Sequence, residues 1–341
     1  MPHHTMPPVP RLTASDLVLE PLTADSAAAI LAGDLSALTP GAGWPHDDTL
    51  DGLRGIAEDR SFGWLVTLHG TVIGDCGVHG TADPSGEIEI GYGLAAPYRG
   101  RGHGTTTVAA ITRYLLSRAE VRRVVAGTDP GNVPSRRVLD SVGFVEVGMH
   151  DGEVRYAIEP VSILLISGST RAASTNTAAL RTAAALAPVG VHARMYPDLA
   201  DLPAFNPDAD RDPATLPRAV QDLRQAIDAA DGVLLSTPEY AGTLPGSFKN
   251  LLDWTVGGAQ LYEKPVAVVN VAAPGRGEGA QATLATVLGY VAAAVDDEAG
   301  ARVYVPREAV GPDGFVEPDD LRDELSRRLA VFARGLRRRR L

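Results

Sequence analysis

Apolar and polar positions follow two different patterns in the two halves of this 341-residue chain. In the first half, short runs that read as strands, such as LVLEPL (17–22) and GEIEIGYGL (86–94), stand among helix-like stretches. The stretch 105–119 carries apolar residues at helical spacing and predicts an amphipathic helix. We expect residues 1–159 to form an α+β domain around a mixed, largely antiparallel sheet.

From residue 160 onward the pattern becomes regular. Runs of branched apolar residues predict buried strands, namely VSILLIS (161–167), GVLLST (232–237), PVAVVNVAA (265–273) and ARVYVP (301–306). They alternate with helix-like stretches such as LPRAVQDLRQAIDAA and AQATLATVLGYVAAA. This alternation predicts an α/β domain over residues 160–341 with a doubly wound parallel sheet, and ligands are expected at the carboxyl ends of its strands.

Composition and net charge indicate which kinds of molecule this chain is expected to bind. The chain is 45% hydrophobic and 21% charged, which is typical of globular domains, and its formal net charge of −11 argues against nucleic acid as a partner. Four arginines near the end, in GLRRRRL, are expected to form a solvated tail, because cations are favoured at the carboxyl end of a helix.

No apolar run reaches the roughly 18 residues that a membrane-spanning helix needs, and MPHHTMPPVPR lacks the charged-then-apolar layout of a secretory leader. We therefore expect a cytoplasmic protein with no membrane partner. The single cysteine, Cys76, lies in the strand-like run TVIGDCGV and is expected to be a structural thiol and not a nucleophile. The eight histidines show no metal-ligand spacing, so no metal site is expected.

A glycine-rich loop, YRGRGHGT (98–105), opens directly into the helix-like stretch of the first half. Such a loop lets backbone N–H groups at a helix N-terminus approach an anion closely. Together with NVPSRRVLDSVGF (132–144), this region, from about residue 17 to 159, resembles the GNAT superfamily of N-acetyltransferases, particularly its ribosomal-protein and small-molecule branch. The family pattern [RQ]-x-x-G-x-[GA] is matched by Arg99, Gly102 and Gly104.

The resemblance implies acetyl-CoA as a cofactor, with its pyrophosphate on the glycine-rich loop. It further implies that the pantetheine arm lies beside the strand that ends near Leu94 and contacts Asn132. The loop residues implied in binding are Arg99, Gly100, Arg101, Gly102, His103, Gly104 and Thr105.

Transfer of an acetyl group to an amine requires a base for the ammonium proton and a donor for the departing thiolate. By resemblance, Glu89 is the candidate base and Ser135 the candidate donor. A solvated strand glutamate and a helix-capping serine are the open alternatives at these positions. Trp44 and His46 are candidates to line the acceptor side, and the acceptor is expected to be a small-molecule amine.

A second loop, SGSTRAASTN (167–176), follows the first strand of the second half. It lacks the spacings of the common nucleotide-binding loops, but its hydroxyls, amide and Arg171 suit a terminal phosphate dianion. With STPEYAGTLPGSFKNLLDW (236–254), it resembles the NAD(P)H-dependent FMN reductase family, a flavodoxin-like group that includes quinone reductases. The fold implied is a doubly wound five-stranded parallel sheet.

This second resemblance implies FMN and NAD(P)H as cofactors. The phosphate would be held by Ser169, Arg171, Ser174 and Asn176, the ring edge would lie along Pro238, Glu239, Tyr240 and Ala241, and Gly277 would approach the pyrimidine end. Many relatives carry Asn where this chain has Ala241, which leaves the reductase subclass open.

We therefore expect a bifunctional protein. An acetyl-CoA-dependent N-acetyltransferase would precede a reductase that passes hydride from NAD(P)H through FMN, in ping-pong fashion, to a quinone-like compound or free flavin. The alternative keeps the reductase and makes the first half a non-catalytic acetyl-CoA-binding or oligomerisation module. Because flavin sites of this family often lie at a dimer interface, a homodimer or tetramer is expected.

Overall fold

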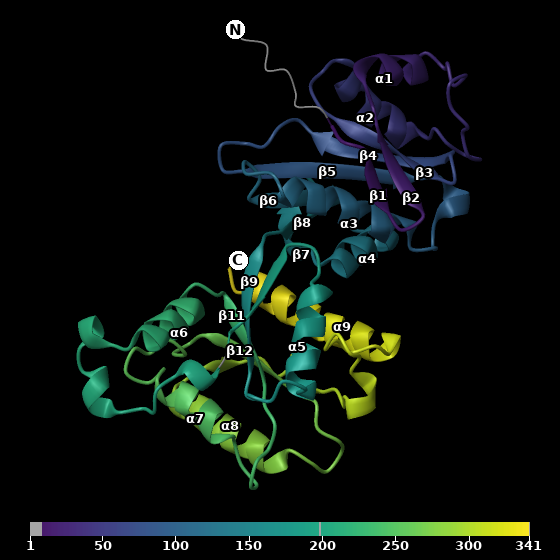
Figure 1. Ribbon diagram of the computed structural model, residues 1–341. Coiled ribbons are helices and arrows are strands. Elements are labelled where there is room, and N and C mark those ends of the chain that lie inside the picture. The colour runs from purple at the N-terminus through teal and green to yellow at the C-terminus, as the bar shows by residue number, and fades with distance from the viewer. Residues whose placement is uncertain (1–8, 198, 341) are drawn as a thin grey trace. The chain divides into compact units, whose positions relative to one another are not determined.

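The computed structural model describes residues 9–197 and 199–340, and it divides into two compact units, Met1–Pro160 and Val161–Leu341 (Figure 1). Most of the N-terminal stretch from which the absence of a secretory leader was inferred, residues 1–8, lies outside the described residues. None of the described helices is long and apolar enough to cross a membrane.

The N-terminal unit is built on an 8-stranded sheet with the order β1-β2-β3-β4-β5-β6-β8-β7. Its elements are β1 (Leu12–Ala14), β2 (Leu17–Pro21), α1 (Ala24–Leu31), α2 (Asp47–Ala57), β3 (Gly63–Leu68), β4 (Thr71–His79), β5 (Glu87–Leu94), α3 (His103–Leu116), β6 (Arg123–Thr128), α4 (Val133–Val142), β7 (Val145–His150) and β8 (Glu153–Ile158). Among the described strands of this sheet, β5 and β6 pair in parallel and the other neighbours pair antiparallel, which confirms the expected α+β domain.

Helices cover both faces of this sheet because neighbouring strand residues point to opposite sides. On β3, Leu65 packs into a cluster with residues of α1 and α2, whereas Trp64 meets Tyr114 of α3 edge to face, with ring centroids 5.5 Å apart. The helix predicted over 105–119 is α3, and its apolar face is fully buried. Cys76 is also buried, and burial raises the pKa of its thiol well above the ordinary value.

The C-terminal unit is a parallel sheet with the order β10-β9-β11-β12-β13, in which β14 also pairs with β12. Its elements are β9 (Val161–Ser167), α5 (Thr175–Ala185), β10 (Val191–Met195), α6 (Arg218–Asp228), β11 (Gly232–Ser236), α7 (Gly246–Asp253), β12 (Pro265–Asn270), α8 (Glu278–Tyr290), β13 (Ala294–Val295), β14 (Ala301–Arg302) and α9 (Asp319–Arg338). The short strands β13 and β14 lie at successive levels of the β12 edge, so five positions across the sheet are filled. This order is the flavodoxin-like one.

Two apolar layers hold this unit together. Alternate residues of the central strands point to α6, α7 and α8 on one face and to α5 and α9 on the other (Figure 1). Residues 301–306 form a shorter strand than expected, although the N–H groups of Val303 and Val305 still donate to carbonyls at the end of β12 and just beyond it. The edge strand β10 had no buried apolar run to announce it, because His192 and Arg194 face solvent.

The expectation of a solvated arginine tail holds for Arg338, Arg339 and Arg340, which are exposed, and is wrong for Arg337. Helix α9 extends to Arg338, and the guanidinium of Arg337 is buried and donates to the carbonyl of Val189 at 3.0 Å. Arg340 pairs with Asp231 at 2.5 Å. Part of the arginine run therefore ties the last helix to the rest of its unit.

Candidate functional site

Strands β5 and β6 form a fork in the N-terminal unit. Their parallel register runs over three residue pairs and ends at Glu89 opposite Val125. Beyond that point β5 continues on β4 alone, and β6 continues on β8 alone. Backbone groups along the separated edges are therefore available to an extended ligand that carries amides of its own.

The glycine-rich loop brings an uncapped helix end beside this fork. Gly102 is the N-cap of α3 at φ +84°, it supplies no capping side chain, and His103 begins the helix. Gly100 also has a positive φ of +73°. The first N–H groups of α3, at His103, Gly104 and Thr105, therefore lie at a helix N-terminus that no side chain caps. This arrangement suits a phosphate.

The side chain of Arg99 serves the loop itself. Its Nε donates to the carbonyl of Leu94, the last residue of β5, at 2.7 Å. This bond holds the start of the loop against the end of the strand. Arg99 was predicted to bind the cofactor directly; the structure places its Nε in an anchoring bond.

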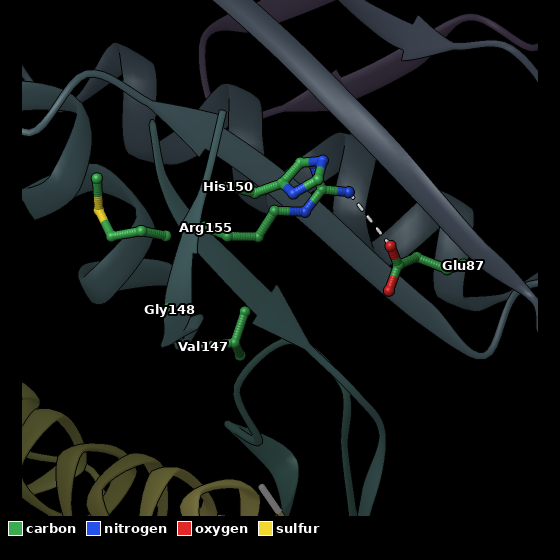
Figure 2. A pocket seen from close by; sticks show the side chains of 6 residues that line it. Glu87, Val147, Gly148, His150 and Arg155 are labelled. Atoms are coloured by element: carbon green, nitrogen blue, oxygen red, sulfur yellow. Dashed lines mark hydrogen bonds and ion pairs between the residues drawn. The ribbon is translucent and has the colours of Figure 1, made fainter. Parts of the chain in front are cut away.

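Glu89 lies where the fork opens, and one of its carboxylate oxygens accepts a hydrogen bond from an arginine. Arg155 of β8 donates to Oε1 of Glu89 at 3.1 Å and to Oε1 of Glu87 at 3.2 Å. Figure 2 shows Arg155 reaching across the sheet toward Glu87. Beside this triad lies an open hollow of about 330 Å³, lined by Glu87, Val147, Gly148, Met149, His150 and Arg155. Glu89 therefore stands in a paired, half-exposed setting rather than as a free strand carboxylate.

Ser135 faces the opposite side of β5 from Glu89. Its Oγ lies 2.8 Å from Oη of Tyr92, and the hydroxyl of Tyr92 also lies 3.2 Å from the backbone carbonyl of Ser135. Burial raises the pKa of Tyr92 to about 12, so this hydroxyl keeps its proton at neutral pH. Tyr92 was missed from the sequence, although strand alternation places it on the face away from Glu89.

Asn132 caps α4, since its Oδ1 accepts a bond from the N–H of Ser135 at 3.2 Å. The capping role considered for Ser135 thus belongs to Asn132. The Asn132 side chain is exposed at the helix end, and its carbonyl oxygen is already engaged.

The region that the sequence suggested as the acceptor side contains a polar cluster of Trp44, Thr49 and Asp75. Trp44 donates through Nε1 to Oδ2 of Asp75 at 2.8 Å, and Thr49 donates to the same oxygen at 2.5 Å. Trp44 is buried in the core, so it does not line a cleft as expected. His46 caps α2 by accepting from the N–H of Thr49, and its ring lies over Gly93, where a Cβ would collide with it.

In the C-terminal unit, the loop 167–176 joins β9 to α5 at the carboxyl edge of the sheet. Ser169 is half-buried and Arg171 is exposed, with its guanidinium donating to the carbonyl of Ala173 at 2.6 Å. Ser174 is the N-cap of α5. Asn176 differs from expectation: its amide is buried and accepts from Ser236 Oγ at 2.9 Å, so this side chain points into the fold.

The loop after β11 is a tight two-residue turn. Tyr240 and Thr243 exchange backbone bonds of 3.0 and 3.1 Å around Ala241 and Gly242, whose φ angles are +50° and +78°. A turn with two positive φ angles is the type I′ geometry, in which Asn and Gly are the favoured residues. This backbone favours Asn over Ala at position 241.

Glu239 links this turn to the next helix. Its Oε2 accepts from the N–H of Ala280 in the first turn of α8 at 3.1 Å. Pro238 precedes it and is half-buried, whereas the Tyr240 ring is 50% exposed. The predicted ring-edge residues thus share one loop, with the carboxylate of Glu239 turned to α8.

The loop after β12 ends at Gly277, which has φ +77° and is the N-cap of α8. A basic residue absent from the predictions, Arg302, holds this loop through three backbone carbonyls and Glu278. The sequence signal for it is weak, because Arg302 lies in a run that reads simply as a strand. The three loops together carry the predicted flavin residues of the C-terminal unit.

Comparisons with known proteins match both halves. Residues 16–145 match the acetyltransferase (GNAT) domain model, and residues 161–300 match the NADPH-dependent FMN reductase model. Quinone reductase from Escherichia coli (strain K12) is 33% identical over 109 residues, which is 32% of this chain and 56% of that protein. A 2-hydroxy-1,4-benzoquinone reductase from Burkholderia sp is 28% identical over 185 residues, covering 53% of this chain and 99% of that protein. The chain thus spans little more than half the length of the first of these curated relatives.

Two solved structures are similar to separate parts of the chain. The Paracoccus denitrificans flavoenzyme NAD(P)H:(acceptor) oxidoreductase FerB aligns with a TM-score of 0.46 at 27% identity, covering 52% of this chain and 98% of that one. Mycobacterium smegmatis RimJ in complex with CoA-disulfide aligns with a TM-score of 0.33 at 25% identity, covering 44% and 86%. The matched families imply FMN and NAD(P)H for the second half and acetyl-CoA for the first.

Proposed function

We propose that this chain, which joins a GNAT acetyltransferase domain to a flavodoxin-like FMN reductase domain, is a bifunctional enzyme. The C-terminal half would reduce a quinone-like compound or free flavin with NAD(P)H through FMN. The N-terminal half would acetylate a small-molecule amine with acetyl-CoA. The observation that carries the proposal is the presence of two differently built anion loops, one in each unit.

The loop 167–176 fits a phosphate monoester. Hydroxyls of Ser169 and neighbouring residues, the guanidinium of Arg171 and the N-terminus of α5 are donors carried by this one loop at the carboxyl end of β9. Ser174 would act through its cap of α5, and Asn176 through its backbone at the start of that helix. When bound, FMN would supply the hydride chemistry, and the protein would bind and orient it.

The reductase half is tested by the absorption spectrum of the purified chain and by NADPH oxidation with added FMN and benzoquinone. We expect the visible absorption band of a bound flavin and quinone-dependent turnover. Arg171→Ala should weaken FMN binding by roughly 10-fold or more, because a charged hydrogen bond to phosphate is worth about 1.5–3 kcal/mol. Unchanged affinity in that variant would refute the phosphate assignment.

The first unit fits acetyl-CoA through its fork and its uncapped helix. Residues 99–105 would meet the pyrophosphate, with Gly100 and Gly102 allowing the close approach. Glu89 would receive the ammonium proton of the acceptor, through its oxygen that Arg155 does not hold. Ser135, backed by the protonated hydroxyl of Tyr92, would donate to the departing sulfur.

Thiol release from acetyl-CoA across a panel of primary amines tests this half. Glu89→Gln should lower kcat by roughly 100-fold or more if the carboxylate takes the proton. Ser135→Ala and Tyr92→Phe should each lower kcat with little change in the KM for the amine. A panel in which no amine stimulates thiol release would count against acetyl transfer.

One observation favours a second candidate, a non-catalytic acetyl-CoA-binding module. The pairing of Glu89 with Arg155 gives that carboxylate a structural role independent of proton transfer. Tight acetyl-CoA binding by calorimetry, without turnover and unchanged in Glu89→Gln, would establish the module.

We further propose a cytoplasmic homodimer or tetramer. The exposed aromatic rings of Tyr262 and Tyr290, at 59% and 89% exposure, support a partner surface on the C-terminal unit. Light scattering after size exclusion measures the assembly, and a monomer at all concentrations would refute it.

A further inference from the structure

One arginine makes several hydrogen bonds to the loop 271–277, in addition to the bonds that Asn270 and the loop's own backbone supply. Nη1 of Arg302 donates to the carbonyls of Ala272, Ala273 and Arg276 at 3.4, 3.1 and 2.8 Å. Nη2 of the same guanidinium donates to Oε1 of Glu278 at 2.7 Å. One planar cation therefore binds both the loop and the first residue of α8.

The sheet register brings Arg302 to this place. Strand β14 pairs in parallel with β12, and Arg302 lies opposite Asn270, the last residue of β12. The guanidinium reaches the loop from the β14 side of β12, whereas β11 lies on the other side of that strand. The turn after β11, residues 240–243, carries part of the predicted ring edge.

The direction of the carbonyls determines where the N–H groups point. In a trans peptide the N–H points opposite to the preceding carbonyl, so the N–H groups of Ala273 and Gly277 point away from Arg302. Neither N–H has a hydrogen-bond partner among the described residues. The start of α8 meets the turn after β11, because a Cβ on Gly279 would collide with the carbonyl of Gly242.

We propose that Arg302 is a positioning residue for the flavin: by binding the carbonyls of loop 271–277, it holds the N–H groups of Ala273 and Gly277 toward the ligand before the ligand arrives. The proposal rests on the proposed flavin site. Donors that are already oriented bind without the entropy cost of ordering a loop, so the guanidinium contributes to affinity without touching the flavin.

The experiment measures FMN affinity by fluorescence titration of the full chain. Arg302→Gln should weaken FMN binding by roughly 10- to 100-fold, because the loop loses the several backbone hydrogen bonds that the guanidinium donates. Arg302→Lys should recover part of the affinity, since it keeps the charge but not the fork. Arg276→Gln is the matched control in the same loop; the exposed side chain of Arg276 has no contact comparable to those of Arg302, and it should stay within about twofold of the wild type.

Amide hydrogen exchange without FMN supplies a second measurement. Residues 272–277 should exchange faster in Arg302→Gln while the protection of β9 and β11 is unchanged, which separates loop disorder from misfolding. Wild-type FMN affinity in a variant whose loop exchanges faster, or unchanged exchange and affinity, would overturn the inference. Failure of the wild-type chain to bind FMN would instead refute the proposed flavin site, and with it the role assigned to Arg302.

Discussion

Asp75 is a half-buried carboxylate that accepts two hydrogen bonds. Replacing it by Asn removes only the charge, whereas replacing it by Ala also removes the hydrogen-bond acceptor. One of its oxygens, Oδ2, accepts from both the indole of Trp44 and the hydroxyl of Thr49, and both donors are buried. Because the two bonds converge on one oxygen, the amide oxygen of Asp75→Asn can accept both. Asp75→Ala leaves both donors without a partner.

The expected cost follows from these bonds. An orphaned buried donor costs about 1–3 kcal/mol, so two should make Asp75→Ala less stable by about 2–6 kcal/mol. Asp75→Asn should stay close to the wild type at acid pH and become the more stable protein as pH rises. Burial raises the pKa of Asp75 above its ordinary value, against the opposing hydrogen bonds from Thr49 and Trp44.

The direction of the pH dependence follows from the linkage between proton binding and folding. A carboxyl whose pKa is raised by folding contributes its stability below the unfolded-state pKa, about 4, and that contribution is lost as pH rises through the folded-state pKa. The free energy of unfolding of the wild type should therefore fall relative to Asp75→Asn from about pH 4 upward. Asp34→Asn is the control of opposite sign, because hydrogen bonds from Ser36 lower the pKa of Asp34.

Urea unfolding followed by tryptophan fluorescence measures this difference, since Trp44 and Trp64 both lie in the N-terminal unit. The reasoning is refuted if Asp75→Asn is as damaging as Asp75→Ala at every pH. It is also refuted if the difference between the wild type and Asp75→Asn does not change with pH.

Three further substitutions test the two loops and the buried pair. Ala241→Asn should raise the melting temperature of the C-terminal unit by roughly 1–4 °C in calorimetry, because about 0.5–1 kcal/mol of strain is relieved at φ +50°; no shift would show that the turn is unstrained. Gly102→Ala should destabilise its unit by about 1–2 kcal/mol and weaken acetyl-CoA binding measured by calorimetry, whereas Gly52→Ala, in open space on α2, should leave that affinity unchanged. Ser236→Ala should cost about 1–3 kcal/mol in urea unfolding by depriving the buried amide of Asn176 of its donor, and an unchanged midpoint would contradict the buried pair.

The spacing of apolar residues along the chain predicted those helices and strands that bury one side and expose the other. Strand β5 and helix α3 were predicted close to their observed ends because alternation and helical spacing report directly which side of an element is buried. Strand β10 was missed because an edge strand with charged outward residues lacks that signal. The prediction of a solvated arginine tail failed at Arg337 for the converse reason: charge predicts solvent exposure, but a long arginine side chain can pack while its guanidinium bonds a carbonyl.

At the candidate site, too, the sequence determined one part and the tertiary structure the other. The chain itself determines which loops carry glycines, hydroxyls and an arginine at the ends of strands, and hence which ligands they suit. Tertiary structure alone decided how those side chains are used: Arg99 anchors its loop, Asn176 turns inward to Ser236, and Glu89 pairs with Arg155. Arg302 became visible only through its register beside β12. The physical reason is that a donor meets its partner through distance in space. Asn176 and Ser236 are 60 positions apart in sequence and Glu89 and Arg155 are 66 apart, so neither pair carries a local sign of its contact.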